Sequence, residues 1–158
     1  MARLYGRAPR GQRVIGWVPY GRWQTTTFLA GLRYDRIVAP LVLDGPIDGP
    51  TFRAWVEQFL APTLEVGDLV VADNLSSHKV AGVREAIEAR GAGIRYLPSY
   101  SSDFNPIEQL FSKLKAIIRG LAPRSRETLF EAIGYAIEQV SPAECANYLA
   151  HAGYGRSA

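Results

Sequence analysis

Residues 68–74 read DLVVADN, and this short stretch decides the kind of fold that the chain can adopt. Its centre is apolar and contains β-branched residues, and it lies between Gly67 and a polar cluster at residues 73–79. Such a pattern predicts a buried β-strand that leads directly into Asp73. In open α/β sheets, ligands bind beyond the carboxyl ends of the strands, so Asp73 lies where catalytic groups are usually placed. An Asx-turn or a helix cap would explain the same aspartate without a catalytic role.

A second carboxylate follows at the start of a predicted helix. Residues 97–108 read LPSYSSDFNPIE, in which Asn105, Pro106 and Glu108 match the N-cap, first and third positions of a capping box. Capping alone would account for Glu108 and requires no catalysis. However, Glu108 lies off the apolar face of this helix, on an edge that continues with cations, so it is equally placed to bind a metal ion.

The rest of the chain alternates predicted strands and helices. Strands are predicted at Gln12–Val18, Gln24–Leu32, Arg36–Leu43, Leu69–Asp73 and Ile94–Leu97. Helices are predicted at Pro50–Ala61, Val80–Arg90, Asn105–Arg119, Glu127–Val140 and Pro142–His151. This order indicates a mixed α/β fold, and a length of 158 residues favours one domain over residues 1–158.

The composition is that of a globular protein. Hydrophobic residues make up 47% of the chain, which is enough to bury a core. No apolar run approaches the roughly 20 residues needed to cross a bilayer, and no signal-peptide pattern is evident. The single cysteine, Cys145, is expected to pack in the last helix, and so few cysteines suit a reducing cytoplasm.

Positive charge is concentrated in two parts of the chain, although the net charge is only +3. Six arginines precede the first acidic residue, Asp35, and a second group of cations surrounds the helix that begins near Glu108. Such clusters are typical of surfaces that contact a DNA backbone, and solvated surface is the alternative for each cation. The candidate DNA contacts are Arg10, Arg13, Lys79, Lys113, Lys115 and Arg119.

The sequence motifs at residues 73–78 and 97–108 together resemble the catalytic core of the DDE transposases of the mariner superfamily, in particular their bacterial insertion-sequence branch. The resemblance rests on Asp73-Asn74-x-x-x-His78 and on the long motif at residues 97–108. Weaker matches at residues 11–13, 25–28, 43–45 and 144–149 extend it over nearly the whole chain. It implies an RNase H-like fold, in which helices flank a mixed sheet.

The resemblance also implies the chemistry of the site. Three acids would bind two Mg²⁺ ions, with Mn²⁺ as a substitute, in order to cut and join DNA strands. Asp73 matches the second acid and Glu108 the third, and the 34 residues between them match the family spacing. Asn74, His78 and Asn105 would support the site; His78 is not expected to be a ligand, because magnesium prefers oxygen.

The first acid of the family has no match in this sequence. Relatives carry it on the first, central strand of the sheet, and no acidic residue occurs between Met1 and Tyr34. Asp44 follows a predicted strand, but the adjacent Gly45-Pro46 favours a turn. We therefore expect a sheet without its first central strand and an incomplete metal site. A late start site, a decayed element or a split reading frame would each produce such a chain, which also lacks the family's helix-turn-helix region.

The leading hypothesis is a transposase catalytic domain. By resemblance, it would cut transposon ends and join them to target DNA at TA dinucleotides. The alternative is a non-catalytic DNA-binding or dimerising remnant of a transposase, and the sequence leaves a homodimer open. An Asp-based phosphatase is a weaker third hypothesis, because the chain contains no Asp-x-Asp motif.

Overall fold

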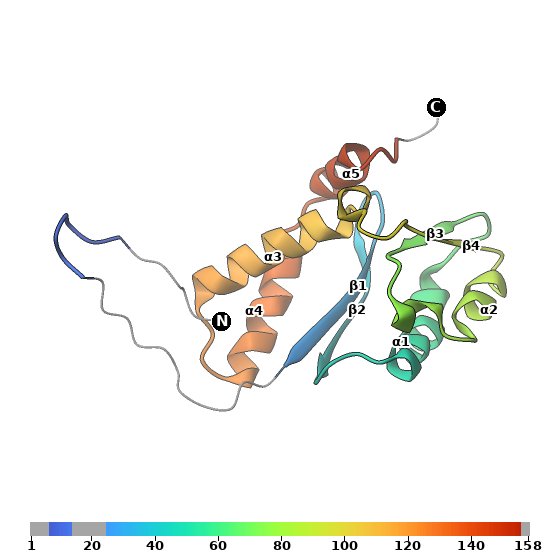
Figure 1. Ribbon diagram of the computed structural model, residues 1–158, viewed down its shortest axis with the longest axis horizontal. Helices are drawn as coiled ribbons and strands as arrows, with labels where there is room; N and C mark the ends of the chain where they lie inside the picture. Colours follow the sequence, from blue (N-terminus) through green and yellow to red (C-terminus); the bar gives the residue numbers. More distant parts are fainter. Residues whose placement is uncertain (1–6, 14–24, 156–158) are drawn as a thin grey trace. The chain divides into compact units, whose positions relative to one another are not determined.

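The structure is a computed structural model that describes residues 7–13 and 25–155. Figure 1 shows the order of its main elements, β1-β2-α1-β3-α2-β4-α3-α4-α5, with short 3₁₀ and π segments between some of them. The chain divides into two compact units, which are described separately. Unit 1 comprises Met1–Trp23 and Phe111–Gln139, and unit 2 comprises Gln24–Leu110 and Val140–Ala158.

Two strands of unit 2 form an antiparallel hairpin. β1 (Thr26–Leu32) pairs with β2 (Ile37–Asp44), and the register changes at a bulge between Leu29 and Gly31. At this bulge Ala39 has a positive φ of 50°. The indole N–H of the buried Trp55 donates a hydrogen bond to the Ala39 carbonyl (2.9 Å). This bond satisfies a backbone acceptor at a position where the bulge interrupts the strand pairing.

The other two described strands are parallel and belong to the same unit. β3 (Leu69–Ala72) pairs with β4 (Gly93–Tyr96), and α2 (Val83–Glu88) lies between them in sequence. The strand predicted from residues 68–74 is therefore confirmed, and Asp73 is the first residue after it. Among the described strands, each one is paired along a single edge.

The helices agree with the predicted order and differ at some ends. The remaining helices are α1 (Gly49–Trp55), which continues as a π segment (Val56–Leu60) and a 3₁₀ turn (Ala61–Thr63), α3 (Ile107–Leu121), α4 (Arg126–Glu138) and α5 (Pro142–His151). Asp48 caps α1 by accepting from the Thr51 N–H (2.9 Å). Ser141 and Glu144 form a reciprocal capping box at α5.

Several predicted bounds differ from those in the structure. The helix expected from Val80 begins at Val83, because Gly82 has a left-handed φ of 95° and the chain first makes a 3₁₀ turn at Ser76–Lys79. The helix expected from Asn105 begins at Ile107. Of the strand expected at Gln12–Val18, Gln12 and Arg13 are not in a strand, and the rest lies outside the described residues.

The core of unit 2 joins both strand pairs to two helices. Val56, Val83 and Ile87 are completely buried in it. The other buried members are Val38, Ala39, Phe52, Trp55, Leu60, Leu64, Ala92 and Ile94. Cys145 is also buried, as expected of a packing residue. The fold is thus a mixed α/β fold with small sheets and flanking helices, and this arrangement is compatible with an RNase H-like fold. Within the described part of the chain, no helix has the length and apolarity of a membrane span.

A bidentate ion pair connects the ends of the two strand pairs. Arg33, just after β1, donates to both carboxylate oxygens of Asp68, just before β3, at 2.6 and 3.0 Å. The Glu65 N–H donates to the same carboxylate (2.9 Å). The hydrogen bond from Arg33, reinforced by that from Glu65, lowers the pKa of Asp68. Less than a quarter of each side chain in the pair is exposed, so solvent screens this pair less than a surface pair.

We expect Arg33→Met to lower the free energy of unfolding by about 1–3 kcal/mol, because it leaves a partly buried carboxylate without its charged partner. Since the folded pKa of Asp68 is lowered, its contribution is complete above the ordinary aspartate pKa and is lost as the pH falls through the folded value. Urea denaturation at neutral and acidic pH measures both effects. Arg36→Met, which breaks an exposed pair with Asp35, is the control and should cost under about 1 kcal/mol. Equal losses in the two variants would contradict this account.

Candidate active site

Parallel pairing brings the carboxyl ends of β3 and β4 to one edge of their sheet. The pairing continues past the strands, because the Leu97 N–H donates to the Ala72 carbonyl (2.8 Å). Asp73 therefore begins one loop, and Leu97 begins the next loop beside it. The second loop leads through a 3₁₀ turn (Ser102–Phe104) to α3, in which Glu108 is the second residue. This connection returns Glu108 to the edge where Asp73 lies.

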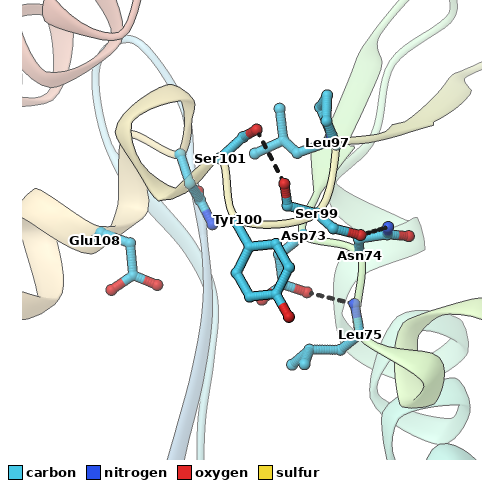
Figure 2. Close-up of a pocket in the computed structure, with 10 residues that line it drawn as sticks. Asp73, Asn74, Leu75, Leu97, Ser99, Tyr100, Ser101 and Glu108 are labelled. Atoms are coloured by element: carbon cyan, nitrogen blue, oxygen red, sulfur yellow. Dashed lines mark hydrogen bonds between the residues drawn. The ribbon is translucent and has the colours of Figure 1, made fainter.

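The two carboxylates line one pocket of about 320 Å³. Figure 2 shows Asp73 extending from the end of β3 and Glu108 from the start of α3, with the ring of Tyr100 in front of Asp73 in this view. The other residues that line the pocket are Asn74, Leu75, Leu97, Pro98, Ser99, Ser101 and Asn105. All of them belong to unit 2, so the pocket is a feature of a single compact unit.

Asp73 has a local structural role in addition to its place in the pocket. Its Oδ1 accepts a hydrogen bond from the Leu75 N–H (3.3 Å), which is the Asx-turn that the sequence offered as an alternative. The Nδ1 atom of His78 lies 2.5 Å from the same oxygen without meeting hydrogen-bond geometry. The Asp73 side chain is 38% exposed, so it is accessible to solvent and to ions. Turn formation and ligand binding are therefore compatible for this residue.

His78 contacts Asp73 from outside the pocket. Its ring stacks on Phe52 of α1, with centroids 4.0 Å apart and planes inclined by 26°. The Tyr96 hydroxyl donates to the His78 backbone carbonyl (2.8 Å), which attaches this turn to β4. Packing and a backbone bond thus fix the imidazole next to Asp73, while its role in supporting the site stays a prediction.

The two asparagines line the pocket itself. Asn74 Nδ2 donates to Ser99 Oγ (2.8 Å), so it connects the loop after β3 with the loop after β4. Asn105 lies in the turn before α3, where its carbonyl accepts from the Glu108 N–H (3.2 Å). That bond orders the residues before α3, while the capping box proposed for Asn105 stays a prediction.

The candidate DNA contacts lie outside the pocket lining. Lys79 Nζ is 5.7 Å from the centroid of the Tyr96 ring, which is a cation–π distance. In unit 1, Lys113 of α3 donates to the Gln139 carbonyl at the end of α4 (2.6 Å). Lys115 and Arg119 are exposed on α3, and Arg10 and Arg13 are exposed in the segment 7–13. Of the six candidate DNA contacts, Lys79 alone belongs to unit 2, which also contains Asp73 and Glu108.

Tyr100 lies in the long motif but is not among the predicted site residues. Tyr100 has a positive φ of 62° and a fully exposed side chain, and it lines the pocket. The motif was the available signal, but no spacing rule predicts that an aromatic ring will point into solvent. Asp44 ends β2 and is followed by a turn at Gly45 (φ 93°), as expected, and it does not line the pocket.

The pocket holds two acids rather than three. All 15 acidic residues of the chain lie within residues 7–13 and 25–155, and no three of them, with or without His or Cys, gather as a metal-binding group there.

Paired carboxylates at the carboxyl edge of a sheet define the class of site that phosphoryl-transfer enzymes use to bind divalent cations. Residues 1–130 match the family described as DDE superfamily endonuclease. The chain belongs to this family; its function is accordingly of the transposase or endonuclease type, and DNA is its partner. No curated protein shows significant sequence similarity to the chain.

Proposed function

We propose that this chain is the catalytic domain of a transposase of the mariner superfamily, from its bacterial insertion-sequence branch. It would cut DNA strands at transposon ends and join them to target DNA at TA dinucleotides. The observation that carries the proposal is that Asp73 and Glu108, 34 residues apart, line one pocket in a chain of the DDE endonuclease family. The branch, the transposon ends and the TA target rest on the resemblance of the motifs.

The residues of the pocket fit a hard divalent cation. Asp73 and Glu108 offer carboxylate oxygens, and Asn74 and Asn105 can offer amide oxygens from the same lining. Asp73 and Glu108 would hold Mg²⁺, for which Mn²⁺ can substitute. When bound, such ions activate the attacking oxygen and stabilise the leaving oxygen of a phosphoryl transfer.

The chain's own residues would keep this ligand pair in place. The Asx-turn to Leu75 and the contact with His78 restrict the Asp73 carboxylate. The bond between Asn74 and Ser99 holds the two loops of the pocket together. Preorganisation of this kind matters because a misplaced ligand lowers the rate even when it still binds the ion.

A third carboxylate is part of the proposal, and we place it on another polypeptide segment, joined to this chain or separate. The strand pattern supports its position: β1 pairs only with β2 and β3 only with β4 among the described strands. In an RNase H-like sheet, a central strand between β1 and β3 would complete the sheet and would present its acid beside Asp73.

DNA strand cleavage in Mg²⁺ tests the proposed function. We expect no cleavage by the 158-residue chain alone, and cleavage when a strand segment that carries an aspartate is fused before Met1. Fused segments with asparagine at the same place should be inactive. DNA binding without cleavage in every case would instead support the non-catalytic remnant, an alternative favoured by a pocket lining that contains two acids.

The exposed cations of α3 give a separate prediction about binding. Each phosphate contact with duplex DNA adds about 0.9 to the slope of log K against log salt, so the double variant Lys115→Gln/Arg119→Gln should lower that slope by about 2. Titrations of duplex DNA at several salt concentrations measure it. Lys113 is left unchanged in this variant, and its ammonium binds the Gln139 carbonyl.

Arg84→Gln is the matched control for this prediction. Arg84 is also an exposed helical cation, and it lies on α2, where it is paired with Glu88 one turn away. Its removal should leave the slope unchanged. If the α3 variant kept the wild-type slope, α3 would not be a DNA-binding surface.

A further inference from the structure

Tyr100 lines the carboxylate pocket, and the proposed reaction gives its aromatic ring no role. The Tyr100 side chain is fully exposed, and Leu75, which also lines the pocket, is 54% exposed. Burial in the core normally explains a large aromatic residue, but this ring is not in the core. Because Tyr100 lines the same pocket as Asp73 and Glu108 (Figure 2), its ring is placed to contact a molecule that occupies the pocket.

The backbone holds Tyr100 in this exposed position at a cost. A φ of 62° is left-handed, a conformation that residues other than glycine rarely adopt. A hydrogen bond also restrains the loop that contains Tyr100. The preceding residue, Ser99, accepts it from Asn74 Nδ2 (2.8 Å). Asn74 follows Asp73 directly, so this hydrogen bond connects the residue before Tyr100 with the residue after Asp73.

We propose that Tyr100 is a stacking platform for an unpaired nucleobase next to the phosphate that is cut. This inference rests on the proposed function. The carboxylates beside Tyr100 would hold the ions that act on the phosphate, and the adjoining neutral base has a π-face that can stack on an aromatic ring. A paired base keeps its faces within the duplex stack, so the ring recognises a base that is flipped out or single-stranded.

Tyr100 is therefore a binding residue for the DNA base rather than a ligand of the metal ion. It would select DNA that is locally unpaired at the cut site. The contact would be tolerant of sequence, because every base offers a π-face. Its strength should depend on the ring and not on the hydroxyl.

Binding of uncut DNA tests the proposal. The probes are a short single-stranded DNA and an abasic backbone of the same length and charge, titrated with the 158-residue chain in Mg²⁺. The wild-type chain should prefer the base-containing probe by roughly tenfold, the value of one stacked base. Tyr100→Ala should abolish this preference by weakening only the base-containing complex, and Tyr100→Phe should retain it.

Tyr135→Ala is the matched control, since Tyr135 is 49% exposed on α4 and does not line the pocket. It should keep the wild-type preference. The proposal is overturned if the wild-type chain shows no preference, or if Tyr100→Ala keeps it or weakens both complexes equally. Cleavage does not enter this measurement, so failure of the proposed function and failure of base stacking give different results.

Discussion

Asp73→Asn and Glu108→Gln should each abolish DNA strand cleavage, lowering the rate at least about a thousandfold. Each change removes one anionic oxygen ligand while keeping the size of the side chain, and loss of metal-ion assistance costs several kcal/mol of transition-state stabilisation. The measurement is single-turnover cleavage by the form of the chain that carries the fused aspartate strand. Duplex DNA binding, measured in parallel, should stay within a few-fold of wild type, because the exposed cations lie outside the pocket lining.

Glu131→Gln is the control for both carboxylate variants. Glu131 is an exposed glutamate on α4, far along the chain from the pocket residues and not part of its lining. The same chemical change there should leave the cleavage rate unaffected. Cleavage that survives in either pocket variant would show that the two acids are not a joint metal site.

Trp55→Ala should lower the free energy of unfolding by about 3–5 kcal/mol, the usual cost of removing a buried large aromatic side chain. Trp55 is 5% exposed and packs against Phe52 with ring centroids 5.5 Å apart. Its indole also satisfies the Ala39 carbonyl at the β2 bulge. Small domains have only about 5–15 kcal/mol of stability, so this loss is a large fraction of the total.

Chemical denaturation of two further variants separates packing from hydrogen bonding. Trp55→Phe keeps most of the packing but leaves the Ala39 carbonyl without its donor, and it should cost about 1–3 kcal/mol. Phe59 lies in the adjacent π segment, and its side chain is 40% exposed. Phe59→Ala should therefore lower the free energy of unfolding by less than Trp55→Ala does. A Trp55→Ala loss no greater than that of Phe59→Ala would contradict the assignment of Trp55 to the core.

Much of the fold was predictable because its local signals are strong. The apolar run before Asp73 has the length and composition of a buried strand, and α5 has a serine cap, proline at the first position and a basic last residue. The start of α2 was less predictable. Ala81 and Gly82 precede the helix, and the left-handed conformation of Gly82 moves its first residue to Val83. The bulge at Ala39 depends on the partner indole of Trp55, which no local pattern reveals.

The candidate site was predictable as a pair of residues but not as a pocket. Motif spacing identified Asp73 and Glu108, and parallel strand pairing explains how both reach one edge. The contacts around them were not evident, because His78 is positioned by Phe52 from another helix and Asn74 by Ser99 from another loop. Long-range contacts of this kind depend on the complete packing of unit 2.

The most direct test of the central claim is the position of bound Mn²⁺ in crystals of this chain, located by its anomalous scattering. The account predicts an ion with oxygen ligands from both Asp73 and Glu108, and its loss in either the Asp73→Asn or the Glu108→Gln variant. Ions bound by only one of these carboxylates, or persisting in both variants, would contradict it.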